Sequence, residues 1–144
     1  MKIERRKQTR PRHCFAAWAV AGMALLPAAV TAESVKVEDL ASNPQSYLGK
    51  EVELVGQCSK GGAGGDVLGY ECTTEETVYV DARKVEPKSV KQKFDKDCVG
   101  KAASGSESCR AIIRFVPHSF TTSTKIESGK NVVVFNTDKA EASF

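Results

Sequence analysis

The sequence predicts a small, mainly β domain that is exported and closed by two disulfide bonds. Three observations lead to this fold class: a basic and then apolar leader, four cysteines in the remainder of the chain, and five segments in which apolar and polar residues alternate. Alternation with a period of two places successive side chains on opposite faces of a strand. Five such segments and one short helix predict a single five-stranded barrel.

The first 32 residues have the three regions of a secretory signal peptide. Residues 1–13 carry six basic residues and one acid, residues 14–26 are an uncharged apolar run, and Val30-Thr31-Ala32 are small residues suited to cleavage. The alternative is a membrane anchor, but thirteen residues span about 20 Å and a bilayer core is about 30 Å thick. We therefore expect cleavage after Ala32, no stable membrane span afterwards, and one periplasmic or secreted domain over residues 33–144.

Removal of the leader reverses the sign of the net charge. The whole chain carries +3, whereas residues 33–144 hold fifteen basic and seventeen acidic residues, a net charge of −2. Nucleic-acid binding draws on a positive surface field. The mature domain is thus a poor match for a nucleic-acid partner.

Cys58, Cys72, Cys98 and Cys109 predict two disulfide bonds, because an exported chain with an even number of cysteines usually oxidises them. A zinc site would need ligands closer in sequence, and the nearest pair here has ten residues between its members. Cys58 and Cys72 are symmetric about Gly65, so a hairpin folded there places them opposite each other. The pairs expected are Cys58–Cys72 and Cys98–Cys109, the second closing a small, polar surface loop.

The alternating pattern gives the strand positions. The expected strands cover residues 49–58, 67–72, 77–83, 110–116 and 131–136, and residues 87–97 form an amphipathic helix with Val90 and Phe94 on its buried side. Residues 59–66 and 117–124 are expected to be loops. The inward-facing residues predicted are Val52, Leu54, Gly56 and Cys58 in the first strand, Val78, Val80 and Ala82 in the third, and Ala111, Ile113 and Phe115 in the fourth.

The approach to the first strand has its own signals. Asp39 is expected to cap a helical turn, Asn43-Pro44 begins another, Tyr47 and Leu48 can plug a barrel end, and Gly49 can end the turn in a left-handed conformation. Residues 37–52, followed by Leu54, Val55 and Gly56, resemble the start of bacterial exported OB-fold domains. That resemblance implies a small OB-like barrel with a helix between strands three and four.

The resemblance also implies where a ligand would bind. OB barrels commonly bind on the face of strands two and three and on the adjoining loops. The candidate ligand-binding residues are Tyr70, Tyr79, Arg83, Arg110, Arg114 and His118. A tyrosine beside an arginine can stack on a ring, so a glycan, an envelope small molecule or an envelope protein partner would suit them.

Signals for catalysis are weak. The mature domain has one histidine, His118, lacks a Gly-x-Ser-x-Gly nucleophile motif, and suggests no metal site and no cofactor. The function expected is a non-catalytic binding or envelope-accessory module. Two alternatives remain: a small secreted nuclease using Asp81, Arg83 and Arg114, although a D-G-D-T segment is missing, and a structural subunit that docks through an exposed strand edge.

Overall fold

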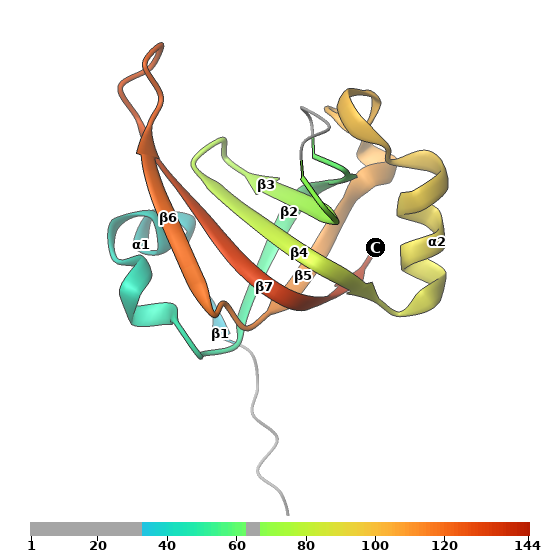
Figure 1. Cartoon of the computed structure of the whole chain (residues 1–144), viewed down its shortest axis with the longest axis horizontal. Helices are drawn as coiled ribbons and strands as arrows, with labels where there is room; N and C mark the ends of the chain where they lie inside the picture. Colours follow the sequence, from blue (N-terminus) through green and yellow to red (C-terminus); the bar gives the residue numbers. More distant parts are fainter. Residues whose placement is uncertain (1–32, 63–66) are drawn as a thin grey trace, which may run out of the picture.

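The protein folds into a closed five-stranded OB-like barrel in a computed structural model that describes residues 33–62 and 67–144 (Figure 1). The strands follow one another in the order β2-β3-β4-β7-β5, and β5 returns to β2. In chain order the elements are β1 (Glu33–Ser34), α1 (Val37–Ser42), the 3-10 turn η1 (Pro44–Tyr47), β2 (Val52–Lys60), β3 (Tyr70–Thr74), β4 (Val78–Glu86), α2 (Lys88–Asp97), the 3-10 turns η2 (Gly100–Ala103) and η3 (Glu107–Cys109), β5 (Arg110–Phe115), β6 (Ser119–Thr124) and β7 (Asn131–Ser143).

Two pairings close the barrel. β2 lies antiparallel to β5, with Val52 opposite Phe115 and Gln57 opposite Arg110. β4 lies parallel to β7, while β3 and β5 are antiparallel to both of their barrel neighbours. The predicted fold class is therefore confirmed, including the short helical segment before β2 and the helix between the third and fourth barrel strands.

The core is built from the alternating residues. Every inward-facing residue predicted for the first, third and fourth strands is buried. Phe94 from α2 and Leu40 from α1 are both fully buried, and each such side chain stabilises the fold by about 2 kcal/mol. The sequence assigned a plugging role to Tyr47 and Leu48; Tyr47 packs half-buried against the core, but the fully buried residue of this segment is Leu40.

The turns before β2 match their sequence signals in part. Pro44 is the first residue of η1, as predicted, and Gly49 has φ +74°, a conformation that glycine adopts without strain. Asp39 does not cap α1, because the helix already begins at Val37 with Lys36 before it. Asp39 instead lies in the first turn, where its negative charge interacts favourably with the helix dipole.

The strand boundaries differ most near the C-terminus. Residues 119–124, expected in a loop, form β6, which pairs with β7 from Ser119–Asn136 to Thr124–Asn131. β7 also continues to Ser143, seven residues beyond the predicted end, and this continuation pairs with β5. The alternation of apolar and polar residues is too weak here to predict strands. β6 is polar and mostly exposed, and the end of β7 places only alanines in the core.

Both predicted disulfide pairs are formed. Cys58 and Cys72 face each other across β2 and β3 with their Cα atoms 4.0 Å apart, and Cys98 and Cys109 have a Cα separation of 5.7 Å. All four cysteines are buried. No helix among the described residues is long and apolar enough to cross a membrane. The predicted signal peptide, residues 1–32, lies outside the described residues and stays a prediction.

Candidate functional site

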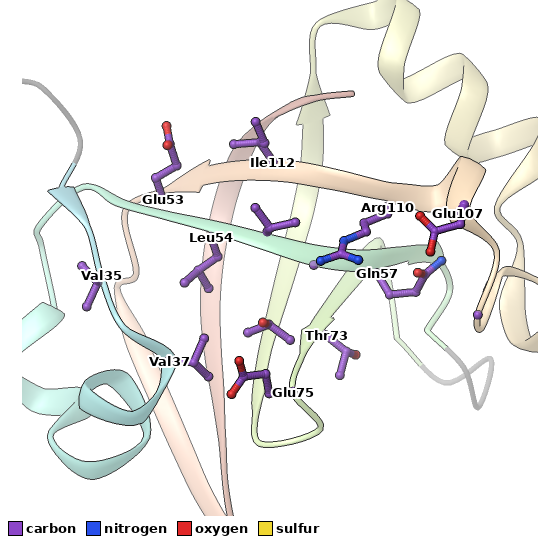
Figure 2. A pocket seen from close by; sticks show the side chains of 14 residues that line it. Val35, Val37, Glu53, Leu54, Gln57, Thr73, Glu75, Glu107, Arg110 and Ile112 are labelled. Carbon is purple, nitrogen blue, oxygen red and sulfur yellow. The ribbon is translucent and has the colours of Figure 1, made fainter.

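A groove crosses the outer face of β2 and β3. It consists of two adjoining hollows of about 510 and 620 Å³, which share Gln57, Thr73, Glu75 and Gly105 in their lining. The first hollow extends toward the N-terminal segment and β5 (Figure 2), and the second extends toward β4 and the β6–β7 hairpin. The OB resemblance implied binding on barrel strands two and three, which are β3 and β4. The groove reaches that face at Glu71, Thr73 and Tyr79, but much of its lining belongs to β2, the first barrel strand.

One wall of the groove is the loop closed by the Cys98–Cys109 disulfide. The Gln57 side chain, which points outward from β2, donates hydrogen bonds from Nε2 to the carbonyl oxygens of Ala103, at 2.6 Å, and Ser106, at 2.7 Å. Ala103, which belongs to this loop, is fully buried. The disulfide limits the span of the loop, and Gln57 fixes it against the barrel.

The first hollow has an apolar floor. Val55 on β2 and Ile112 on β5 are direct cross-strand partners, and they are 48% and 41% exposed. Val35 and Val37 from the N-terminal segment line the same hollow, on the far side of β2 from Ile112 (Figure 2). Because burial of apolar surface is favourable, a ligand that covers these exposed apolar side chains would gain binding free energy.

The second hollow has an aromatic end. Tyr79 on β4 is half-buried, and the Lys125 Nζ lies 5.8 Å from the centre of its ring, within range of a cation–π contact. Lys125 belongs to the connection between β6 and β7, so the hairpin that the sequence did not predict contributes to this end of the groove.

Carboxylates dominate the lining of the groove. The two hollows together contain six glutamates and two cationic residues, a formal charge of −4: Glu53, Glu71, Glu75, Glu76, Glu107 and Glu127, with Arg110 and Lys125. Glu53 accepts a 2.8 Å hydrogen bond from Arg114, which raises the pKa of that guanidinium. A groove of this charge repels phosphate-rich ligands and attracts cationic ones.

The structure separates the six candidate ligand-binding residues. Tyr79 and Arg110 line the two hollows of the groove. Arg83 and His118 line a different hollow, of about 680 Å³, with Asp81. Arg114 lies on the outer face of β5 and lines a smaller hollow of about 280 Å³ with His118.

Tyr70 differs from the other candidates because it is a core residue, 4% exposed. Its hydroxyl donates a hydrogen bond to Asp95 on α2, and burial together with this bond raises the pKa of Tyr70. Asp95 also accepts a hydrogen bond from Lys91 and lies 3.2 Å from the Lys60 Nζ. The bonds from Lys91 and Tyr70 lower the pKa of Asp95 to about 2. This cluster attaches α2 to the barrel.

Sequence reasoning missed the main feature of the groove, which is the position of the loop over β2. The spacing of Cys98 and Cys109 predicted a closed loop but gave no location for it. The only available signal was Gln57, an outward-facing amide on the first strand. Its contacts lie 46 and 49 residues further along the chain, so local pattern could not reveal them.

No group of three or more His, Cys, Asp or Glu side chains within the described residues is arranged to hold a metal ion. His118 is exposed and makes its observed contact through its backbone amide, which donates to the Asn136 carbonyl. The geometry thus defines a surface groove on a barrel.

The fold and the groove define a class, a small disulfide-closed barrel with an acidic outer face. No family model matches the chain, and no curated protein or solved structure is significantly similar to it.

Proposed function

We propose that the chain is an exported, non-catalytic binding module whose ligand occupies the groove on β2 and β3 and carries positive charge. The observation that carries this proposal is the lining of the groove, which combines a formal charge of −4 with an apolar floor at one end and Tyr79 at the other. Ligand sites combine apolar surface with a few placed polar groups in this way.

The expected export of the protein agrees with the same proposal. Two buried disulfides are compatible with an oxidising compartment. Residues 1–32 have the composition of a signal peptide, which would direct the chain to such a compartment. In the envelope, the ligand would be a cationic small molecule, an amino sugar or a basic segment of a protein. The charge of the groove argues against nucleic acid as the partner.

The nuclease alternative receives no support from the arrangement of its residues. Asp81 and Arg83 line one hollow, whereas Arg114 lines others and is bound to Glu53 and, at 3.8 Å, to Glu51. Cleavage of DNA that depends on a divalent ion and disappears in Asp81→Ala would nevertheless replace the binding proposal.

The proposal can be tested by NMR titration of the oxidised protein with spermidine, a small polycation. We expect amide shifts concentrated at Gln57, Thr73 and Tyr79, and an affinity that falls about fivefold in Glu76→Gln/Glu127→Gln, because each exposed charge pair contributes up to about 1 kcal/mol. A single-stranded DNA oligonucleotide should produce no such shifts.

The matched control is Glu38→Gln/Asp39→Asn, which removes two charges from exposed positions on α1, outside the groove. If both double variants lower the affinity for spermidine equally, or if the amide shifts are scattered over the whole surface, spermidine binding depends on net charge alone. The groove would then not be the site.

A further inference from the structure

The strand β2 has a short stretch of edge with no neighbour. On one side it pairs with β5 over Val52–Gln57, but on the other side β1 covers Val52 and Glu53 and β3 covers Gln57–Lys60. Leu54–Gly56 therefore face no strand on that second side among residues 33–62 and 67–144. This gap lies between Val37 and Glu75 at the first hollow of the groove (Figure 2).

The backbone of Val55 points into the gap. Cys58 and Cys72 are a closely spaced pair, with Cα atoms 4.0 Å apart, so Cys58 belongs to a pair without ladder hydrogen bonds and its neighbours Gln57 and Ser59 bond to β3. The Lys60 amide confirms this alternation, because it donates to the Cys98 carbonyl on the opposite edge. Val55 follows the same parity as Gln57, so its N–H and C=O face the gap.

The surroundings of the gap specify an occupant. An extended peptide placed there would exchange two hydrogen bonds with Val55, and its side chains would alternate between the two faces of the barrel wall. On the outer face lie the carboxylates of Glu75 and Glu107, while on the inner side lies Leu54. A segment in which basic and apolar residues alternate would satisfy both sides.

We infer that the groove takes a basic, extended segment of a partner protein, which pairs with β2 at Val55 in the gap between β1 and β3. This inference rests on the proposed function and narrows it to a peptide ligand held by its backbone. The paired stretch is short, so the cationic side chains and the apolar floor supply the remaining affinity, and binding weakens as salt increases.

The test measures binding of the labelled peptide acetyl-Lys-Val-Lys-Val-Lys-amide to the oxidised protein by fluorescence anisotropy. Two changes each remove one hydrogen bond: Val55→Pro removes the N–H of the protein, and N-methylation of the central lysine removes the N–H of the peptide. We expect each change to weaken binding about fivefold, since a single hydrogen bond contributes about 1 kcal/mol.

Controls separate backbone pairing from charge. Val55→Thr keeps the N–H and the branched shape but makes the apolar floor more polar, so its loss of affinity measures the side chain alone. Val55→Pro should weaken binding about fivefold beyond Val55→Thr. The peptide acetyl-Glu-Val-Glu-Val-Glu-amide should not bind. If Val55→Pro fails to fold, the N-methylated peptide still decides the question on the native protein.

The outcomes distinguish this inference from the proposed function. Affinity that is insensitive to both N–H deletions overturns the strand pairing, as does absence of peptide binding while spermidine still shifts Gln57 and Thr73. In both cases the proposal that the acidic groove binds a cationic ligand stands. Absence of spermidine shifts together with absence of peptide binding removes both.

Discussion

At the scale of single residues, Asp95 has the most consequential contacts outside the groove. It joins three elements, because its carboxylate meets Lys60 of β2, Tyr70 of β3 and Lys91 of its own helix. The lowered pKa of Asp95 expresses how strongly these neighbours favour the ionised form. A residue that the sequence assigned to a ligand surface, Tyr70, is therefore part of the attachment of α2.

We predict that Asp95→Asn lowers the free energy of unfolding by about 1 kcal/mol at pH 7, a value discounted for the partial exposure of the cluster. Because the pKa of Asp95 is lower in the folded protein, the stabilisation is complete above the ordinary carboxyl pKa and disappears as the pH falls toward 2. Thermal unfolding from pH 7 to pH 2 should show the difference from the native protein shrinking over that range.

Asp97→Asn is the matched control, since Asp97 is exposed on the same helix. A difference between Asp95→Asn and the native protein that stays constant down to pH 2 would contradict the role assigned to the carboxylate.

At the scale of elements, the loop between Cys98 and Cys109 depends on β2 for its position. Its two carbonyl groups, on Ala103 and Ser106, share one donor group on Gln57. Each carbonyl also accepts a backbone hydrogen bond within the loop, Ala103 from the Ser106 amide and Ser106 from the Cys109 amide. Loss of the Gln57 donor therefore removes only the bonds that attach the loop to β2, each of which contributes about 1 kcal/mol. The shape of the groove therefore depends on one side chain at its floor.

Gln57→Ala should accelerate amide hydrogen exchange across residues 100–106 by about tenfold, because the loop loses about 1.4 kcal/mol of its attachment. Exchange in β4 and β7 should remain slow, since the disulfide and the barrel are untouched. The control is Gln92→Ala on the exposed face of α2. Unchanged exchange in the loop would show that the disulfide alone holds it in place.

The elements also show how far the sequence could be interpreted. β2 and β5 were predictable because one of their faces is apolar at every second residue and the other is polar apart from Val55 and Ile112. β6 was not, since its outer edge and most of its side chains meet solvent and no alternation results. The groove was beyond prediction because it forms where the Cys98–Cys109 loop meets β2, and that meeting depends on tertiary structure.

At the scale of the whole molecule, β7 holds the barrel together. It is parallel to β4 and antiparallel to both β5 and β6, and Phe135, Ala140 and Ala142 enter the core from it. Figure 1 shows β7 crossing the molecule from the projecting hairpin to the C-terminus beside α2. The last part of β7, which the sequence did not predict as a strand, is the part that meets β5.

Deletion of residues 138–144 should abolish cooperative unfolding, because it removes every pairing between β7 and β5 and opens the core at Phe115. Deletion of Phe144 alone should cost only about 1 kcal/mol, since this half-exposed ring contacts Phe94 and Lys93 at the surface. Calorimetry of the two truncated proteins would compare them. A cooperative transition in the longer deletion would show that the barrel does not need the pairing between the end of β7 and β5.

The positions of the two disulfides have a consequence for chain assembly. Gln57 and Arg110 pair across the closing seam and are 53 residues apart, but the bonds bypass 14 and 11 of those residues. The flexible path between the seam partners is thereby shortened to roughly half. Halving a loop lowers its closure cost by about 0.6 kcal/mol, so oxidation of two local pairs makes this long-range strand contact easier to form.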